Sequence, residues 1–543
     1  MFKKDIIFIL ILILISLSIT FICQKECLFN KYIAHDDSSQ YIFPFYRVKD
    51  PQLFQNDIFV EYSLSYNTKG SVIIYNFFSK FMDPLVLSKI LPFILHCLTA
   101  IYFFLIGKRI KNTFVGFLAA IIFIMHSWTF FCFSGGHAKA FSFLLLSTFI
   151  YYLLIKRYKL ILIILFLQIF IYPSIAAISI LSLFILSFLS IINSPKFGLL
   201  LNKGSKFFIY IGLVGIFTMY FMYLLPDSFK GPLYSFREII SMPEFYYGGR
   251  AVLFINSLVM LKDQVISENV TGLPLYSFPT WFLLSISGLG LFLIIKKKIT
   301  VNNILTVFCI SGLFLFILAW LALFNLYSPG RFLKFSSLLY LIFLSALTIN
   351  RIFIEVGKKR KLTRLFIISL VIILIYFPFL DRMQFTFFKN KGLYDYLTTL
   401  PKNVLIAGHP FEMNEIPLFS KRKVFIEYEL SLPFYKNYYE KIKQRTYDFF
   451  RIYYSNDIDE IKQICSFYKI DYFVIKKEHF TKSYLDVKEF YINPFNDKIK
   501  QIIKQNIQNG FILTSIPKRY RLYEDDNFFV INIHDIAKTE DKI

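Results

Sequence analysis

Long blocks of apolar residues, separated by short polar connections, set the pattern of this chain. Residues 6–23 contain no charged side chain, and a helix needs about 20 apolar residues to cross the hydrocarbon core of a bilayer. We predict about eleven transmembrane helices, which makes the chain a polytopic α-helical membrane protein. The predicted spans are 6–23, 85–106, 113–131, 139–155, 160–174, 175–191, 207–225, 278–295, 303–325, 333–349 and 364–380.

The stretch 160–191 can be read as one span or as two. As a single helix it would be about 48 Å long, far more than the bilayer core. The sequence Tyr172, Pro173, Ser174 near its middle offers a break, because proline removes a backbone donor and clashes with the preceding turn. Two spans also keep every basic connection on one side of the membrane, so we predict two.

Basic residues gather in every second connection. The clusters are Lys3–Lys4, Lys108–Lys111, Lys156–Lys159, Lys196–Lys206, Lys296–Lys298 and Lys358–Arg364. Because Lys and Arg in short loops mark the cytoplasmic side, we predict a multi-pass protein of the cell membrane with a cytoplasmic N-terminus. The outer loops are then 24–84 and 226–277, and the C-terminal tail also lies outside. The first span lacks a small-x-small cleavage site, which predicts an uncleaved anchor.

The tail from 381 to 543 loses the apolar blocks and has the pattern of a soluble α/β domain. Its predicted strands are 404–408, 423–427, 471–475 and 528–532. Asp457 is a predicted N-cap for a helix between the second and third of them. Strands that alternate with helices predict a small mixed or parallel sheet. We therefore divide the chain into a transmembrane domain, 1–380, and an extracytoplasmic domain, 381–543.

Composition agrees with this division and argues against a nucleic-acid partner, a zinc site and a disulfide framework. Apolar types make up 56% of the chain, charged types 18%, and the net charge is +24. Much of the positive charge lies in the short clusters that set membrane orientation, so no nucleic-acid partner is predicted and the bilayer is the expected surroundings. The six cysteines have no CxxC spacing, which argues against a zinc site and a disulfide framework.

The most suggestive chemistry lies in the first outer loop. His35 is followed by adjacent acids, Asp36 and Asp37, with Tyr41 shortly after. Two neighbouring carboxylates repel, which raises the pKa of one and prepares it as a proton acceptor or a metal ligand. The alternative is that Asp36 or Asp37 only caps the helix that follows, since Asp favours that position.

Other candidates lie in later outer connections. Arg331 stands on the predicted outer side, where the orientation rule calls for no cation. Its guanidinium matches phosphate geometry, although snorkelling toward lipid headgroups explains it equally well. Gly135 and Gly136 form a turn before His137 and Lys139, and paired glycines either make a simple turn or let the backbone approach a ligand.

The loop 226–277 mixes charged and aromatic residues, among them Arg237 and Arg250. This composition is typical of a loop that covers a substrate, and equally of a solvated loop. We retain both arginines as candidate substrate-binding residues.

These features resemble the GT-C superfamily of membrane glycosyltransferases, which includes protein O-mannosyltransferases, oligosaccharyltransferases and bacterial lipid-A-modifying transferases. In that superfamily an acidic motif follows the first span, and an outer C-terminal domain is common. Asp36 and Asp37 match the position of the motif, and Tyr41 matches the aromatic residue that often follows. Arg331 matches a basic residue that contacts the phosphate of the donor.

The chain also departs from the superfamily in two respects. It has no WWD motif, which disfavours the oligosaccharyltransferase branch. It shows no second acidic pair in a later outer loop, which leaves open whether a divalent metal such as Mg²⁺ or Mn²⁺ is used.

The resemblance implies transfer of a hexosyl or pentosyl unit from a polyprenyl-phosphate donor at the extracytoplasmic face. The acceptor is a lipid, glycan or protein. Asp36 or Asp37 would accept the proton of the acceptor hydroxyl, and Arg331 would stabilise the phosphate leaving group, with inversion at the anomeric carbon. His35, Tyr41, His137 and Lys139 are implied to bind substrate beside them.

Three other functions compete with transfer. A transporter or flippase of lipid-linked saccharides would place ionisable residues inside its spans, whereas the predicted spans hold almost no Asp or Glu and only His96 and His126 stand out. A polymerase of lipid-linked saccharides would use the same substrates at the same face. A non-catalytic scaffold or receptor is the third alternative.

Overall fold

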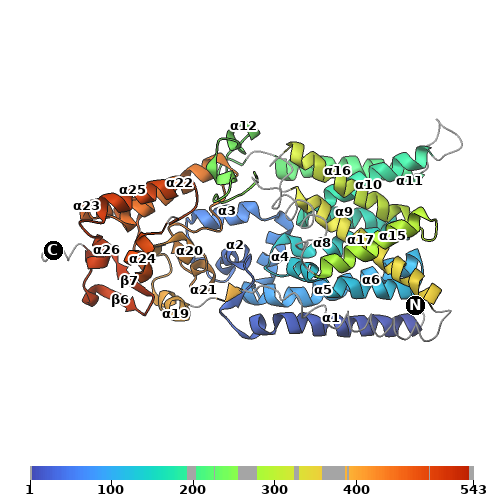
Figure 1. The fold of residues 1–543 in the computed structure, drawn as a ribbon, viewed down its shortest axis with the longest axis horizontal. Coiled ribbons are helices and arrows are strands. Elements are labelled where there is room, and N and C mark those ends of the chain that lie inside the picture. The colour runs from blue at the N-terminus through green and yellow to red at the C-terminus, as the bar shows by residue number, and fades with distance from the viewer. Residues whose placement is uncertain are drawn as a thin grey trace.

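The computed structural model describes residues 3–192, 203–224, 227–254, 278–322, 329–356, 386–387, 390–487 and 489–536. A bundle of long helices and a globular tail stand end to end, with the short helices of the first outer loop between them (Figure 1). The N-terminus lies at the end of the bundle remote from the tail (Figure 1). At that end Lys108 pairs with Asp5 at 2.6 Å, so the end of the second long helix lies beside the start of the first.

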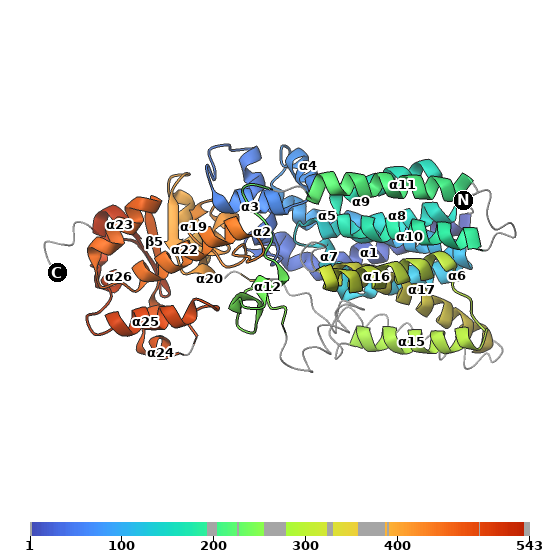
Figure 2. The ribbon, with the colours of Figure 1, turned by 90° about the horizontal axis from the view of Figure 1, so that it is seen from above.

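The bundle consists of apolar helices, because an apolar segment in a bilayer must pair its own backbone groups. Its helices are α1 (Lys3–Phe29), α5 (Pro84–Ile110), α6 (Thr113–Met125), α7 (Ser127–Phe133), α8 (Ser142–Leu154), α9 (Tyr158–Ile171), α10 (Pro173–Ile192), α11 (Lys203–Met219), α15 (Phe278–Ile295), α16 (Asn303–Ala322) and α17 (Gly330–Val356). Figure 2 shows α11 and α15 at opposite edges. Hydroxyls of Ser287 and Ser345 link α15 to α17 at 3.0 Å.

The predicted count of eleven spans is not confirmed. Among the described helices, six are long and apolar enough to cross a membrane, or up to seven if α6 and α7 form one broken span. Helices α8 and α9 have 13 and 14 residues, about 20 Å of helix against a core of about 30 Å. The last predicted span, 364–380, lies outside the described residues.

Two helix breaks test the predicted boundaries. The break around Pro173 is confirmed, because α9 ends at Ile171 and α10 begins at Pro173. The helix predicted over 113–131 is interrupted, because α6 and α7 meet at His126 with a bend of 69°. The hydroxyl of Thr129 donates to the carbonyl oxygens of Phe123 and His126 at 3.0 and 2.6 Å, which adds side-chain hydrogen bonds across the bend.

The bundle turns large apolar side chains outward, as a lipid-facing surface requires. Leu14 on α1 and Phe217 on α11 are about two-thirds exposed, at 65% and 64%. Some polar side chains inside the bundle pair with one another, for example Ser16 with His96 Nδ1 at 2.9 Å. The structure therefore agrees with an α-helical membrane domain.

The first outer loop folds into β1 (Ile33–Ala34), α2 (Ser38–Tyr41), a 3₁₀ segment (Phe43–Val48), α3 (Ile58–Tyr66) and α4 (Lys69–Phe78). Its buried aromatic residues share one apolar core with the tail. The rings of Tyr62 and Tyr438 stack with centroids 3.7 Å apart. This segment, predicted as an appendage of the membrane domain, is thus packed into the tail as well.

The tail contains the predicted mixed sheet. Strand order is β4 (Lys423–Val424), β3 (Leu405–Gly408), β5 (Tyr472–Lys476), β7 (Phe528–Asn532) and β6 (Arg521–Glu524), parallel among the first three and antiparallel thereafter. The covering helices are α19 (Lys391–Thr399), α20 (Pro410–Met413), α21 (Ile416–Phe419), α22 (Lys436–Tyr453), α23 (Ile458–Tyr468), α24 (Lys482–Leu485), α25 (Asn496–Asn506), α26 (Ile512–Ser515) and α27 (Ile533–Ile536). Asp457 caps α23 as predicted, accepting from two backbone N–H groups.

Two further connections hold the tail against the end of the bundle. Strand β2 (Thr386–Phe387) pairs antiparallel with β1, directly before the acidic motif. The second outer loop carries α12 (Phe236–Ile239) and runs beside α22, where Lys436 pairs with Glu238 at 2.5 Å. Three segments that are far apart in the sequence therefore meet beside residues 35–41.

Candidate active site

The acidic motif forms a tight turn that leads into α2. Backbone N–H groups of Ser38 and Gln40 donate to the carbonyl oxygens of His35 and Asp37 at 2.9 and 3.1 Å. Asp37 occupies the N-cap position, but its side chain accepts no capping hydrogen bond. The capping alternative is thereby excluded for Asp37, whose carboxylate is directed to other groups.

The carboxylate of Asp37 lies in a nest of basic side chains from the Gly135–Gly136 turn. Its Oδ2 is 3.0 Å from Nζ of Lys139 and 2.9 Å from Nε2 of His137. Burial opposes ionisation, but Lys139 and His137 outweigh it and hold the pKa of Asp37 well below its usual range. Asp37 is therefore a fixed anion at neutral pH.

His35 supports the same turn as a neutral ring. Burial lowers the pKa of His35 to about 3, and its Nδ1 accepts from the backbone N–H of Asp37 at 3.2 Å. Gly135 has φ of +85°, and a Cβ there would stand 2.6 Å from His35 Nδ1 and 3.0 Å from Asp37 Cβ. The glycine turn is thus needed for close approach to the acidic motif, beyond its role as a turn.

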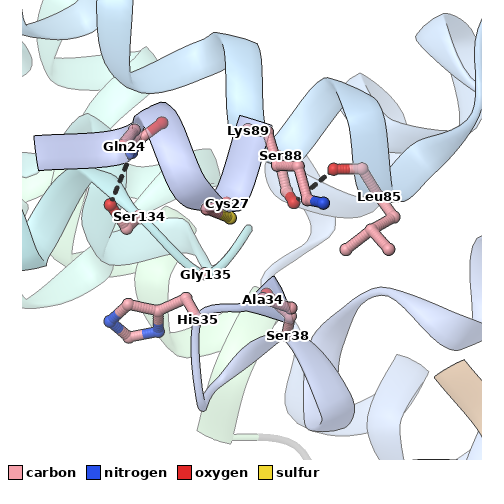
Figure 3. A pocket seen from close by; sticks show the side chains of 10 residues that line it. All are labelled: Gln24, Cys27, Ala34, His35, Ser38, Leu85, Ser88, Lys89, Ser134 and Gly135. Atoms are coloured by element: carbon pink, nitrogen blue, oxygen red, sulfur yellow. Dashed lines mark hydrogen bonds between the residues drawn. The ribbon is translucent and has the colours of Figure 1, made fainter. Parts of the chain in front are cut away.

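A cavity of about 10 Å³ lies behind His35, between the end of α1 and the start of α5 (Figure 3). Gln24 donates to the hydroxyl of Ser134 at 3.0 Å on its wall. This volume holds about one water molecule and excludes a sugar. A substrate therefore approaches from the other side of the motif, where Asp36 is exposed.

Arg331 belongs to the same end of the bundle. It lies in the first turn of α17 rather than in a loop, which corrects the predicted start of that helix at 333. Its guanidinium hydrogen-bonds to the phenols of Tyr66 and Tyr172. Tyr66 lies beside Tyr41, with ring centroids 6.1 Å apart, and Tyr41 lies beside His137 at 5.6 Å.

The two arginines of the second outer loop differ in their surroundings. Arg250 donates from Nε to the carbonyl oxygen of Tyr428 at 2.9 Å, and its Nη2 pairs with the Glu429 carboxylate at 2.9 Å. Arg250 therefore ties the second outer loop to the tail. Its role in substrate binding stays a prediction. Arg237 is exposed on α12, and no contact among the described residues links it to the acidic motif.

Glu429 connects the tail to the acidic motif. Its Oε2 accepts from Nε2 of Gln40 at 2.7 Å, one turn after Asp36. Burial raises the pKa of Glu429, and the charges of Asp36 and Asp37 raise it further against the opposing effect of Arg250. A carboxyl group from the tail thus stands within electrostatic reach of both acids of the motif.

Glu415 is the second carboxyl group that the tail brings near Asp36. Burial raises the pKa of Glu415 to about 8, and the charges of Glu412, Asp36 and Glu429 add to the rise. Glu427 is fully buried behind it, and neither of its carboxyl oxygens has a hydrogen-bond partner among the described residues. Burial also raises the pKa of Glu427. A raised pKa favours the neutral carboxyl group, which limits the repulsion around Asp36.

Solved structures with the same architecture exist. One is archaeal oligosaccharyltransferase AglB from Archaeoglobus fulgidus in complex with an inhibitory peptide and a dolichol-phosphate, at a TM-score of 0.51, 13% identity, and coverage of 89% of this chain and 70% of that chain. Another is the Archaeoglobus fulgidus oligosaccharyltransferase tethered with an acceptor peptide, at a TM-score of 0.51, 12% identity and the same coverage. This chain has the GT-C fold. Neither a protein-family profile nor a curated protein matches its sequence.

The structure brings five of the candidate residues together. Asp37, Tyr41, His137, Lys139 and Arg331 come from three separate stretches of chain, and the structure brings them to one end of the bundle. Glu415 and Glu429 were missed, because the tail shows no local motif around them. Only the pairing of β1 with β2 and the shared core place them here.

The described residues contain no group of three or more His, Cys, Asp and Glu side chains placed to hold a metal ion. In the acidic motif Lys139 already neutralises Asp37, so a cation there would compete with an ammonium group. The arrangement in the described part of the chain does not fit a divalent metal between the two acids.

Proposed function

We propose that this chain is a membrane glycosyltransferase. It moves a sugar from a polyprenyl-phosphate-linked donor to an acceptor hydroxyl at the extracytoplasmic face. The observation that carries the proposal is that Asp37 of the acidic motif and the phenol-bound cation Arg331 both lie within electrostatic reach of Tyr41, while Asp36 of the same motif is exposed. The GT-C fold supports it, since AglB was solved with a dolichol-phosphate.

The chemistry needs one base and one cation. The acceptor oxygen forms a bond to the anomeric carbon while the bond from that carbon to the phosphate oxygen breaks. The hydroxyl proton passes to Asp36, and the electron pair leaves with the polyprenyl phosphate, whose growing charge Arg331 stabilises. Attack opposite the leaving group inverts the anomeric centre.

Asp36 and Asp37 take different parts in this proposal. Asp37 is paired at 3.0 Å with Lys139, and a carboxylate with so low a pKa is a poor proton acceptor. Asp36 is exposed, so an acceptor hydroxyl can reach its carboxylate. Asp36 is therefore the base, and Asp37 positions the turn that presents it.

The tail supplies the acceptor side of the site. It closes over the motif through Gln40, Glu429 and Arg250, so a lipid, glycan or protein acceptor reaches Asp36 between the tail and the bundle. The predicted orientation, with basic loops in the cytoplasm, puts this opening outside the cytoplasm. A hexosyl or a pentosyl donor fits the same chemistry.

The test is transfer of radiolabelled sugar from polyprenyl-phosphate donors by membranes that contain the chain. We expect Asp36→Asn to lose about 10²–10⁴-fold of the transfer rate, the usual contribution of a general base. The matched control is Asp50→Asn in the same outer loop, where Asp50 pairs with Lys402 at 2.6 Å away from the motif. Full transfer by Asp36→Asn at equal protein level would disprove the assignment.

A further inference from the structure

A second, larger cavity lies where the first outer loop meets the tail. It measures about 450 Å³, is open to solvent, and lies between the start of α3 and the helices α22 and α23. It is lined by Ile58, Glu440, Lys441, Gln444, Arg445 and Tyr468. The residues of the candidate active site take no part in its walls. A cavity of this size falls within the range of small-molecule sites.

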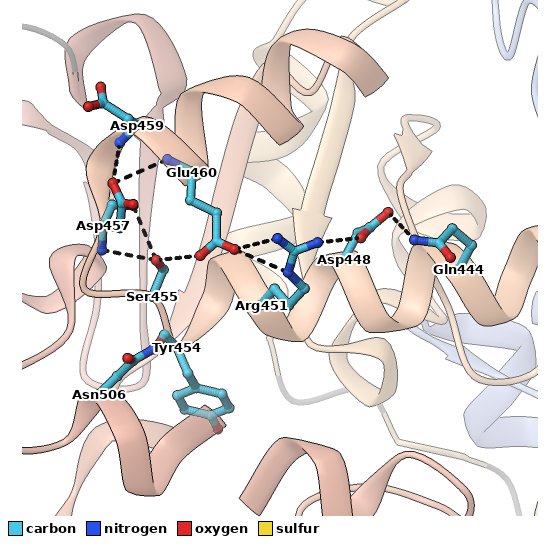
Figure 4. Close-up of polar contacts among 9 residues, drawn as sticks. All are labelled: Gln444, Asp448, Arg451, Tyr454, Ser455, Asp457, Asp459, Glu460 and Asn506. Carbon is cyan, nitrogen blue, oxygen red and sulfur yellow. Dashed lines mark hydrogen bonds and ion pairs between the residues drawn. The ribbon is translucent and has the colours of Figure 1, made fainter. Parts of the chain in front are cut away.

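Two of its lining side chains are held in place by one carboxylate. Asp448 accepts from the amide nitrogen of Gln444 at 3.0 Å and from the hydroxyl of Tyr468 at 2.8 Å. Arg451 in turn links Asp448 to Glu460, at 3.4 and 2.6 Å (Figure 4). Because Asp448 is buried, this network fixes the orientation of the wall before any ligand arrives, as a preorganised site requires.

Arg445 forms the flat part of the wall. Its guanidinium lies 5.4 and 5.9 Å from the ring centroids of Phe425 and Tyr468, and Nη1 donates to the carbonyl oxygen of Phe425 at 3.3 Å. The buried carboxylate of Asp57, which caps α3, offsets its charge. A guanidinium carries five N–H donors, and the hydrogen bond to Phe425 uses Nη1.

The chemistry of this wall fits a saccharide. Amide, guanidinium and carboxylate groups present donors and acceptors in planar pairs, which match the adjacent hydroxyls of a sugar. The apolar side of Ile58 and the ring of Tyr468 suit the C–H face of a pyranose. A bare phosphate is disfavoured, because Asp57 offsets the charge of Arg445 and Glu440 adds a carboxylate to the lining.

The position of the cavity relates it to the active site. Helix α3 runs from Ile58, in the cavity wall, to Tyr66, which binds Arg331. Its 9 residues span about 12 Å. A ligand that reaches from Arg331 to the cavity is therefore longer than one sugar ring.

We propose that this cavity is a saccharide-binding subsite that holds sugar residues of the donor or acceptor beyond the one transferred. The inference rests on the proposed glycosyl transfer for its biological meaning, but binding itself does not depend on transfer. Donor glycan and acceptor glycan share the same chemistry, and the experiment separates them.

Binding is tested first, with the full chain in detergent and saturation-transfer NMR of four free tetrasaccharides: maltotetraose, mannotetraose, chitotetraose and a hyaluronan tetrasaccharide. We expect saturation transfer to at least one of them, reduced at least tenfold by Gln444→Ala and by Arg445→Met. Gln444 is exposed, so its variant keeps the fold even where Arg445→Met leaves Asp57 unpaired. Lys504→Met on α25, an exposed lysine outside the cavity, is the matched control and keeps full binding.

Three results would overturn the subsite. They are no signal with any of the four sugars, a signal that Gln444→Ala leaves unchanged, and salt-sensitive binding of inorganic phosphate without sugar binding. The source of the sugar is then read from transfer kinetics. A KM raised by Gln444→Ala only for long-glycan donors assigns the donor, and a KM raised only for long-glycan acceptors assigns the acceptor. If the wild type transfers nothing, the proposed function fails while the binding result still decides the subsite.

Discussion

The two halves of the candidate active site hold their carboxyl groups in different states. On the membrane half, Lys139 pairs with Asp37 at 3.0 Å and holds the pKa of this acid well below its usual range. On the tail half, burial raises the pKa of Glu415 and of Glu429, and Glu429 pairs with Arg250. The membrane half also carries Arg331, so it supplies the cations that the proposed phosphate leaving group would need.

The largest expected effect comes from the cation of the membrane half. Arg331→Ala should lower the transfer rate about 10²–10³-fold, the usual loss when one group that stabilises developing charge is removed. Arg331→Lys should recover part of this loss, since an ammonium supplies charge without the bidentate fork. The measurement is radiolabelled sugar transfer at saturating donor.

The control for this change lies on the same helix. Arg351→Ala removes a cation that pairs with Glu355 at 2.5 Å at the opposite end of α17, and it should leave transfer unchanged. Equal losses for both arginine variants would mean that α17 needs its charges for insertion rather than for catalysis.

A smaller effect is expected from Lys139, which neutralises Asp37. Lys139→Met removes the main cause of the low pKa of Asp37, so burial then raises that pKa. Asp37 should become protonated as the pH falls, and the turn that presents Asp36 should loosen. We expect about tenfold lower transfer near pH 6 and a smaller loss near pH 8, seen as an acid limb displaced to higher pH. A uniform loss at every pH would contradict this role.

The contacts of Glu429 with Gln40 and Arg250 join the two halves, and their loss is expected to lower transfer less. Glu429→Gln and Arg250→Gln each leave a half-buried charge without its partner, and each should lower transfer about two- to tenfold. The double variant should lose less than the product of the two, because residues in contact are coupled. A double-mutant cycle on kcat/KM measures this, and strict additivity would show that Arg250 does not act through Glu429.

The smallest expected effect is on stability. The pKa of Glu415 is raised to about 8, so between its ordinary 4.5 and 8 the folded chain binds a proton that the unfolded chain releases. The contribution of Glu415 to the free energy of unfolding is therefore most favourable below pH 4.5, and it falls as the pH rises from 4.5 to about 8. The Tm of the wild type should drop by a few degrees between pH 5 and pH 8.5, and Glu415→Gln should drop less. Identical profiles of Tm against pH for the wild type and the variant would mean that Glu415 is exposed to water in the folded chain.

Prediction from sequence succeeded where the signal is local and periodic. The apolar blocks fixed the helices of the bundle, and Pro173 fixed the break between α9 and α10. It did not predict the bend at His126, where the apolar run is continuous. It also did not predict the ion pair of Arg250 with Glu429, because charge alone does not tell which partner lies opposite.

The sequence by itself determined that the chain enters a membrane, that its tail is an α/β domain, and that an acidic motif follows the first span, since each depends on neighbouring residues. Only the tertiary structure decided which acid is paired and which is exposed, and that Glu429 and Glu415 belong to the site. The physical reason is that a carboxylate takes its role from desolvation and from charges within a few ångströms. Those charges come from the turn before α8, from the second outer loop and from the tail. No local sequence pattern predicts that these segments meet.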